Sequence, residues 1–504
     1  MTGGERSAEL LAARGVRRIG RAMEDSCVST PIEPLTQQTR APAALRVASW
    51  VVLGGVLFWL AFVGRAQIRL QGPDFEYFYK AGAWLLNNGS LDCGFDRVDG
   101  RRVDRGTLDW YWPVVSRGMT LLAWLPLKTA GYVWLALNVA ALVATLRMLA
   151  RLAPGPWRED WVVTAAVPLL LLTAYWQWEF RLNQINNFTL LLMVGSFVCW
   201  EQGRRNVAGF WLGFAVLLKV TPALLVVWFA LKRQYRTVAV TVLTMVLVGP
   251  VGNLLSLGPE LTIESYRAWL HNAVTVGSQA GLVRTQREMD WRNQGLGAVA
   301  SRWLHPTNYN THFDNDPRVQ ESYAEHDVRT LNVVSLPVPT VAAIVTGMVL
   351  ATVVGLGWLA RRPARQMTQW ELRVEWALFV LAMLWLMPVM RRYHMIWALP
   401  ALSLLLAAGT RLNWRRGWAR AAAACVSVAV LAQLTLFWRP LEARGSILAS
   451  VAVMALPMVL LLWKLRRRPD LLEAPAQTET GVVVREAPPA VVSEPVLKAA
   501  GEHA

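Results

Sequence analysis

The chain has 504 residues, of which 54% are hydrophobic, and it carries 26 tryptophans. This composition is typical of a protein that crosses a membrane several times and excludes an ordinary soluble globular protein. The formal net charge of +17 could indicate nucleic acid as a partner, but the Lys and Arg residues form short clusters between apolar segments. That pattern follows the positive-inside rule, so we interpret the charge as a sign of topology and predict no nucleic-acid partner.

The chain divides by composition into three parts. Residues 1–43 contain no apolar core followed by a small-residue cleavage site, so we expect them to remain as a cytoplasmic N-terminal segment. Residues 44–465 form the predicted membrane domain, with outer loops at 66–129 and 258–333. Residues 466–504 are rich in Ala, Pro, Glu and Val without helical periodicity, which predicts a disordered cytoplasmic tail.

Ten apolar runs are long enough to cross a hydrocarbon core of about 30 Å, which needs about 20 helical residues. They lie near residues 44–64, 130–150, 160–178, 186–202, 237–257, 334–360, 372–389, 393–411, 418–437 and 445–465. The sequence therefore predicts an all-α polytopic membrane protein, a bundle of about ten transmembrane helices with amphipathic helices in its outer loops. Four scattered cysteines without a C-x-x-C spacing indicate neither a zinc site nor a disulfide framework, so the sequence points to no metal site and no cofactor is firmly indicated, while metal dependence stays open.

Residues 207–231 interrupt the alternation of loop charge, because basic residues flank both ends of this apolar segment. If the chain turns at 219–222, each arm has about 11 residues, or roughly 16 Å of helix, which is about half a bilayer. Pro222 breaks a helix, and Lys219 would be costly if it faced lipid. We therefore predict a re-entrant or two-short-helix hairpin whose apex, Lys219, faces protein and serves a function.

Asp74 follows a Gly-Pro turn just after the first span and precedes Glu76, Tyr77 and an amphipathic stretch. Asp74 would therefore lie near the membrane surface. The alternative to a functional role is that Asp74 only caps the helix that follows it, as Asp commonly does.

The second outer loop concentrates polar side chains that could hydrogen-bond a sugar or a phosphate. They are Arg181, Asn183, Gln184 and Asn186. Helix capping and solvation at the membrane interface are the alternative explanation.

Arg391, Arg392 and His394 lie at the outer end of two spans, where the positive-inside rule disfavours basic residues. Their cationic and donor groups suit the oxygens of a phosphate, and attachment to anionic lipid headgroups is the competing explanation. Asn293 and Gln294 lie in the last large outer loop.

Taken in order, these motifs resemble the polyprenol-phosphate-mannose-dependent mannosyltransferases of glycosyltransferase family 87, within the membrane-embedded GT-C superfamily. The resemblance covers roughly residues 45–410. It is carried by Asp74-Phe75-Glu76-Tyr77, Tyr111-Trp112-Pro113, Asn183-Gln184-Ile185-Asn186, the Gly-Phe-x-x-x-Leu-Lys-x-Thr-Pro run around Lys219, Asn293-Gln294-Gly295, and His394 after Pro388. The chain departs from the family pattern at Gly295, where Ser is frequent, and at 391–394, where a Ser-Trp-x-His-like run is common.

The resemblance implies an enzyme of the bacterial plasma membrane and cell envelope, whose active site faces the non-cytoplasmic side. It implies transfer of mannose, with inversion, from a polyprenyl-phosphate co-substrate to a glycolipid or glycan acceptor. It makes Asp74 the catalytic base and Lys219, Arg391, Arg392 and His394 the phosphate-binding residues. The substrate-binding residues that it implies are Glu76, Tyr77, Arg181, Asn183, Gln184, Asn186, Asn293 and Gln294.

Two other classes of protein remain open on the sequence alone. A lipid or sugar transporter also needs polar groups and helix breaks at membrane depth, but we find no internal inverted repeat. A lipid-diphosphate-dependent polymer ligase could also have a large outer loop containing Arg residues, such as 258–333.

Overall fold

The computed structural model describes most of one compact unit, Gln38–Leu472. The described residues are 41–70, 74–88, 95–98, 101–104, 111–152, 161–271, 273, 278–286, 288–310, 328–412, 420, 423–424, 426–427, 433 and 438–472. Residues 473–504 of the predicted tail and nearly all of the predicted N-terminal segment lie outside these residues. Residues 466–472, which were predicted to begin the disordered tail, are instead described as helical up to Arg467 and again over Pro469–Leu472.

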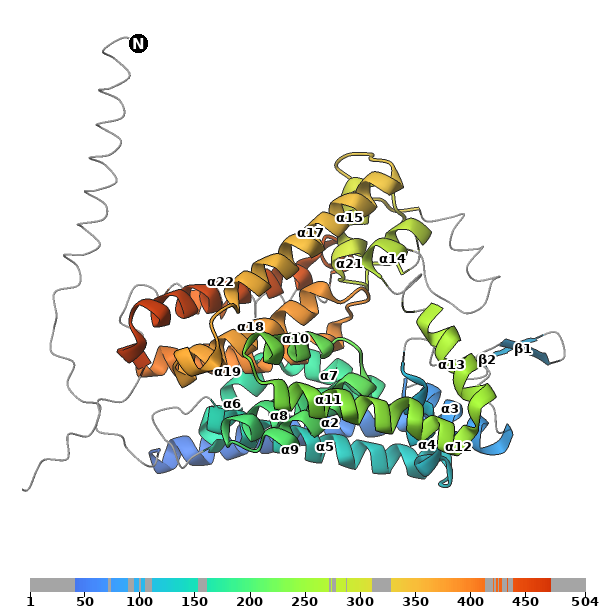
Figure 1. The fold of residues 1–504 in the computed structure, drawn as a ribbon, viewed down its shortest axis with the longest axis horizontal. Coiled ribbons are helices and arrows are strands. Elements are labelled where there is room, and N and C mark those ends of the chain that lie inside the picture. The colour runs from blue at the N-terminus through green and yellow to red at the C-terminus, as the bar shows by residue number, and fades with distance from the viewer. Residues whose placement is uncertain are drawn as a thin grey trace, which may run out of the picture. The chain divides into compact units, whose positions relative to one another are not determined.

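The unit is built almost entirely from helices (Figure 1). Its first half contains α2 (Ala43–Leu70), α3 (Phe75–Asn88), α4 (Pro113–Ala123), α5 (Leu127–Leu152), α6 (Trp161–Leu171), α7 (Thr173–Leu182), α8 (Asn186–Glu201), α9 (Arg205–Leu218), α10 (Ala223–Leu231), α11 (Tyr235–Val246), the π-helix η1 (Leu247–Val251), α12 (Gly252–Leu257) and α13 (Pro259–His271). One element departs from the all-α prediction: β1 (Phe95–Val98) and β2 (Arg101–Asp104) pair antiparallel in the first outer loop.

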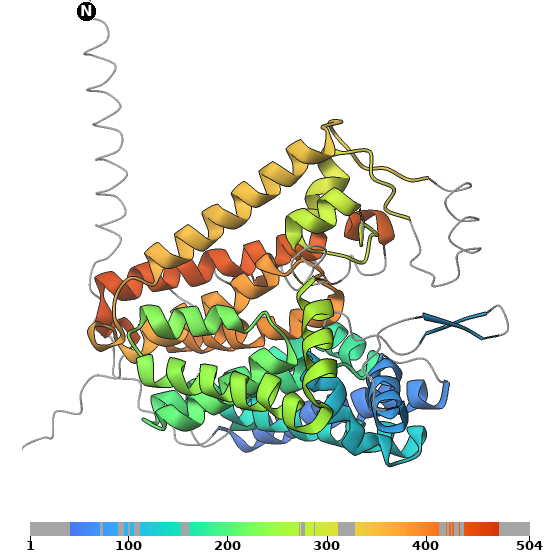
Figure 2. The same ribbon diagram turned by 45° about the vertical axis from the view of Figure 1, so that its right-hand side comes forward.

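The second half continues the helical arrangement. It contains α14 (Gln279–Thr285), α15 (Leu296–Leu304), α17 (Val338–Leu359), η3 (Ala364–Gln366), α18 (Gln369–Leu386), the 3₁₀ helix η4 (Arg392–Ala398), α19 (Leu399–Arg411), α21 (Arg439–Ala443), α22 (Ser446–Arg467) and η6 (Pro469–Leu472). Figure 2 shows α17 as a long helix along one edge of the bundle, which agrees with the small buried share of its apolar stretch.

Six helical segments within the described residues are long and apolar enough to cross a membrane. They are Ala43–Arg69, Leu127–Leu152, Tyr235–Leu257, Val338–Leu359, Arg392–Arg411 and Ser446–Arg467. The pair α6 and α7, bent by 80°, raises the number to seven if it forms one span. The chain is therefore an integral membrane protein, but the predicted count of about ten spans is not confirmed.

The difference in span number has local causes. The run 160–178 breaks at Leu172 into α6 and α7, and α8 has only 16 residues. The run 372–389 corresponds to α18, which carries three charged residues in its first two turns. The run 418–437 lies mostly outside the described residues.

The predicted break at 219–222 separates α9 from α10. Glu201, just before α9, pairs with Arg373 at 2.8 Å, and Lys232, just after α10, forms an ion pair with Glu375. Both partners lie in the first turns of α18, so the two arms return to the same end of that helix. Lys219 between them reaches His394, beyond the opposite end of α18.

Close packing holds the α9 arm against α11. A Cβ atom added at Gly209 would lie 2.6 Å from the Thr237 carbonyl oxygen, and one at Gly213 would lie 2.6 Å from Thr244 Cβ. This Gly-x-x-x-Gly spacing is the arrangement by which membrane helices bring their backbones together without a hydrophobic driving force.

The core lies around α8, which other helices enclose and which is therefore apolar on most sides. Phe197 of α8 stacks on Trp376 of α18 at 4.6 Å, and Trp228 of α10 donates to Glu375 at 3.0 Å. These contacts fix the helices whose far ends carry the polar residues described next.

Candidate active site

The candidate site lies at helix breaks, at the end of the bundle opposite the Glu201, Lys232 and Glu375 ion pairs. Four breaks contribute to it: the start of α3, the α7–α8 loop, the α9–α10 turn and the segment between α18 and η4. Because backbone at a break leaves the regular helix, side chains there can converge on one point.

Asp74 immediately precedes α3, and its carbonyl oxygen accepts the backbone N–H groups of Tyr77 and Phe78. Its carboxylate accepts a hydrogen bond from the side-chain amide of Gln184. Burial raises the pKa of Asp74 to about 6, although Gln184, Arg391 and Lys219 each oppose the rise. A carboxylate with this pKa is ionised at neutral pH and still basic enough to accept a proton.

Lys219 lies at the centre of the site. Its Nζ donates to Asn186 Oδ1 over 2.6 Å and lies 2.6 Å from His394 Nε2. The rings of Tyr111 and Trp397 flank it at 5.9 and 5.8 Å. The predicted hairpin apex thus faces protein and polar groups, as expected for an ionisable residue at membrane depth.

A buried carboxylate anchors the α7–α8 loop, which carries Gln184 and Asn186. Glu179 is 1% exposed, and it accepts from Asn186 Nδ2 at 2.8 Å and from the Asn187 backbone N–H at 2.9 Å. Asn186 therefore links Glu179 to Lys219. These amides do not cap α8, whose N-cap residue is Ile185 and has no side-chain cap bond; instead Gln184 bonds Asp74 and Asn186 bonds Lys219.

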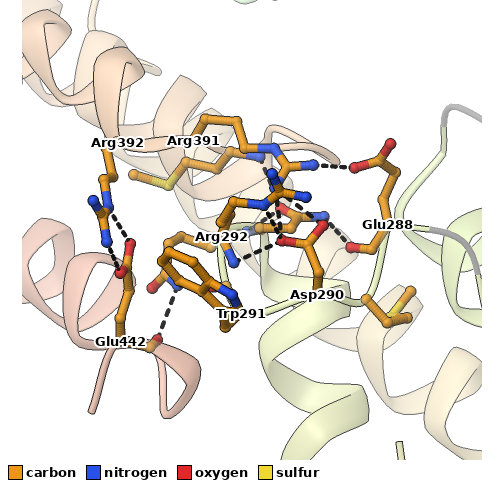
Figure 3. Close-up of polar contacts among 12 residues, drawn as sticks. Glu288, Asp290, Trp291, Arg292, Arg391, Arg392 and Glu442 are labelled. Carbon is orange, nitrogen blue, oxygen red and sulfur yellow. Dashed lines mark hydrogen bonds and ion pairs between the residues drawn. The ribbon is translucent and has the colours of Figure 1, made fainter. Parts of the chain in front are cut away.

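Arg391 is held by two carboxylates (Figure 3). Its guanidinium donates to Asp290 at 2.9 and 3.2 Å and also to Glu288. Burial alone would raise the pKa of Asp290, but its ion pairs with Arg391 and Arg292 outweigh burial and lower it to about 2. The predicted phosphate ligand Arg391 thus has its charge balanced by protein carboxylates.

Arg392 points to a different set of partners, as Figure 3 shows. It donates to both carboxylate oxygens of Glu442, one of them at 2.6 Å. Its guanidinium also lies 4.9 Å from the Trp178 ring and 5.1 Å from the Trp291 ring. This bidentate, ring-stacked arrangement is characteristic of a structural arginine.

Asn293 and Gln294 hold the 288–295 segment against the segment before η4. Asn293 Oδ1 accepts from the backbone N–H groups of Gly295 and Met390 at 2.8 and 3.0 Å. Gln294 Nε2 donates to the carbonyls of Trp291 and Glu442 at 2.8 and 2.9 Å. The Asn293 amide and the Gln294 amide nitrogen are thus engaged with backbone, whereas Gln294 Oε1 has no hydrogen-bond partner among the described residues.

Gly295 explains one departure from the family pattern, because an added Cβ would lie 2.3 Å from the Pro388 carbonyl oxygen. Arg302, fully buried, donates to the carbonyls of Asp290, Asn293 and Ala443 at 2.7–2.9 Å. Together these contacts bind the 288–295 segment firmly to the segment that carries His394.

The remaining predicted residues lie at the margin of the site. Glu76 pairs with Lys80 at 2.8 Å on the exposed side of α3, and Tyr77 is 40% exposed. Arg181 is exposed and stacks over Trp178 at 4.8 Å. Asn183 is buried in the left-handed conformation, with φ of 49°, and its side-chain atoms have no hydrogen-bond partner among the described residues.

Sequence reasoning missed the acidic partners: Glu179, Glu288, Asp290 and Glu442. The basic residues at 391–392, which depart from the positive-inside rule, could have indicated these acidic partners, because arginines buried in protein need nearby carboxylates. Within the described residues no group of three His, Cys, Asp or Glu side chains could hold a metal ion.

Comparison with known proteins supports the resemblance. Residues 111–348, just under half of the chain, match the profile of glycosyltransferase family 87. The matched segment contains Gln184, Lys219 and Asp290, whereas Asp74 precedes it and His394 follows it. The structure brings both of these flanking residues to the matched segment.

One curated relative is the "Polyprenol-phosphate-mannose-dependent alpha-(1-2)-phosphatidylinositol mannoside mannosyltransferase" of Mycolicibacterium smegmatis. It is 26% identical over 259 residues, which are 47% of this chain and 54% of the relative. The chain thus matches about half the length of that relative. No solved structure matches the chain.

Proposed function

We propose that the protein is an inverting membrane mannosyltransferase, which moves mannose from a polyprenyl-phosphate donor to a hydroxyl of a glycolipid acceptor. The observation that carries the proposal is the position of Asp74. Its carboxylate is held by Gln184 beside the Lys219–His394 pair, so a base and phosphate-binding groups share one site. The match to the family 87 model and the donor named for the relative support the same reaction.

In the proposed reaction the acceptor oxygen attacks the anomeric carbon, and its proton passes to the Asp74 carboxylate. The bond between that carbon and the phosphate oxygen breaks, and polyprenyl phosphate leaves from the opposite face. General-base help is worth roughly 10²- to 10⁴-fold, and fixed donors at the leaving group contribute a comparable factor. Asn186, which bonds Lys219, is proposed to orient that donor group.

Lys219 and His394 are the proposed phosphate ligands. The Arg391 backbone N–H donates to His394 Nδ1 at 2.9 Å, so in the neutral ring Nε2 carries the proton. In the proposed complex a phosphate oxygen lies between this N–H and Lys219 Nζ and accepts from each, which requires the two nitrogens, 2.6 Å apart in the free protein, to separate. Arg391 and Arg392, which are already paired with carboxylates, are proposed to position the segment and not to contact the phosphate.

The proposed site faces the outer side of the plasma membrane. The bundle end opposite the site carries Arg362, Arg373 and Arg466, and basic residues of this kind mark the cytoplasmic side. A donor whose polyprenyl tail lies in the outer leaflet could then present its phosphate to Lys219.

The test is incubation of the purified protein with a panel of polyprenyl-phosphate and polyprenyl-diphosphate sugars and a phosphatidylinositol mannoside acceptor. We expect release of polyprenyl phosphate and a mannosylated product with polyprenyl-phosphate mannose. Turnover only with a diphosphate donor would instead indicate the ligase class, and transport of the lipid without any sugar transfer would indicate a transporter.

A further inference from the structure

A second group of polar side chains lies where α4, α12 and α13 meet, apart from the Asp74 site. We call it the α4–α13 cluster and define it as Trp112, Arg117, Asn253, Tyr266 and Trp269. Five of its buried polar atoms have no hydrogen-bond partner among the described residues: the indole nitrogens of Trp112 and Trp269, the Tyr266 hydroxyl and both side-chain amide atoms of Asn253. Asn253 is 0% exposed.

The aromatic members of the cluster are in contact. Trp112 and Trp269 stack with ring centroids 4.1 Å apart and an interplanar angle of 24°. The ring of Tyr266 lies 6.1 Å from that of Trp112 at 64°. The stack joins the start of α4 to α13.

Two glycines bring the polar members to the same place. A Cβ added at Gly249 would lie 3.2 Å from the Tyr266 hydroxyl, and one at Gly252 would lie 2.3 Å from Arg117 Nη1. Asn253 follows Gly249 by four residues and therefore lies on the same helical face. Arg117 is fixed there by its bond to the Val248 carbonyl at 2.6 Å. This carbonyl belongs to the π-helix η1, a distortion frequent at functional sites.

The cluster adjoins the candidate active site through one residue. Tyr111, whose ring lies 5.9 Å from Lys219 Nζ, immediately precedes Trp112. The cluster also lies at the outer end of the span Tyr235–Leu257. A ligand bound there would be next to the reacting groups and level with lipid headgroups.

The chemistry of the cluster favours a neutral, oxygen-rich ligand. Indole nitrogens and guanidinium groups only donate hydrogen bonds, whereas a phenol and an amide can donate and accept. Buried polar atoms without partners destabilise a fold, so their concentration at one place indicates that a ligand supplies the partners. Sugar hydroxyls can accept and donate at once, and aromatic rings provide apolar faces for sugar C–H groups.

We propose that the α4–α13 cluster binds the sugar headgroup of the glycolipid acceptor. This inference rests on the proposed function, because it assigns one of the two substrates of that reaction to a place in the structure. The donor phosphate lies on the Lys219 side of Tyr111, and the acceptor headgroup lies on the Trp112 side, with its reactive hydroxyl directed to Asp74.

The test uses Asn253→Leu and Trp269→Phe in the full chain. We expect each to raise KM for a phosphatidylinositol mannoside acceptor roughly 10-fold, the effect of losing one hydrogen bond between neutral groups. KM for polyprenyl-phosphate mannose should stay within about 2-fold of wild type. Trp376→Phe is the matched control, because its indole nitrogen is also buried without a partner but lies in the helical core.

Direct binding separates this inference from the proposed function. Calorimetric titration of nanodisc-embedded protein with the same phosphatidylinositol mannoside should show weaker binding for Asn253→Leu than for wild type at equal thermal stability. Unchanged acceptor affinity and KM in both variants would overturn the inference, as would a rise confined to donor KM. Absence of all sugar transfer by the wild type would contradict the proposed function, and the binding comparison would still decide the role of the cluster.

Discussion

The backbone N–H of Arg391 donates a hydrogen bond of 2.9 Å to His394 Nδ1, while its guanidinium is paired with Asp290. The same residue therefore orients the imidazole through its main chain and anchors the segment through its side chain. Arg391, just after the C-terminal end of α18, thus fixes the geometry of this segment, whereas Lys219 and His394 face the site itself.

Asp290→Asn should weaken the ion pair by which Arg391 anchors the segment that carries His394. Breaking a buried ion pair typically costs about 3–5 kcal/mol, here reduced because Glu288 still pairs with Arg391. We expect a lower thermal midpoint in detergent and a higher donor KM, with partial recovery in Asp290→Glu. Asp470→Asn is the control: its pair with Arg468 is exposed at 3.8 Å, so the change should be under about 0.5 kcal/mol. Equal effects of the two substitutions would contradict the anchor.

The pH dependence of the reaction should report Asp74. Its pKa is raised to about 6 by burial, and the base must be deprotonated to act. We expect kcat/KM to rise with pH through about 6 and then level off. Gln184→Leu removes a hydrogen bond that lowers this pKa, so the rising limb should move to higher pH. The exposed Gln202→Leu should leave the profile unchanged, and a Gln184→Leu profile identical to wild type would count against the assignment.

The two lysines that flank α10 should behave differently. Lys219→Met should raise donor KM about 10-fold or more, because a charged group at the phosphate is lost while Asn186 and His394 remain neutral. Lys232→Met should instead lower the thermal midpoint, because buried Glu375 loses its ion-pair partner. Kinetics and thermal unfolding of both variants check this division, and a purely stability-related effect at Lys219 would argue against a substrate contact.

The Gly-x-x-x-Gly contact of α9 offers a prediction about folding alone. Gly209→Ala should destabilise the protein by about 1–3 kcal/mol, because the new Cβ would lie 2.6 Å from the Thr237 carbonyl. Gly347→Ala in α17 meets no atom within 4 Å and should be neutral or slightly stabilising. The measurement is thermal unfolding in the same detergent. Similar losses at both glycines would show that the α9–α11 contact is unimportant.

The sequence predicted the membrane class and the break at Lys219, because apolar length and a proline beside a lysine are local signals. It predicted too many spans, because length alone does not reveal that α6 and α7 bend by 80° or that α8 is short. Apolar composition is shared by spans and by short helices buried among other helices.

The site was foreseen only in part. Asp74, Gln184, Asn186, Lys219 and His394 come together as the motifs suggested. The sequence could not show that Arg391 and Arg392 pair with carboxylates, so it predicted them as phosphate ligands. Their carboxylate partners are 50 to 103 residues away along the chain. Pairing over such distances is set by tertiary structure.

The most direct measurement of the proposed chemistry is single-turnover mannose transfer by Asp74→Asn from polyprenyl-phosphate mannose to a phosphatidylinositol mannoside. The amide is close in shape to the carboxylate but cannot accept the proton, so the rate should fall by about 10²- to 10⁴-fold. Donor affinity and thermal midpoint should remain near wild type. A transfer rate within a few-fold of wild type would contradict the role of Asp74 as base.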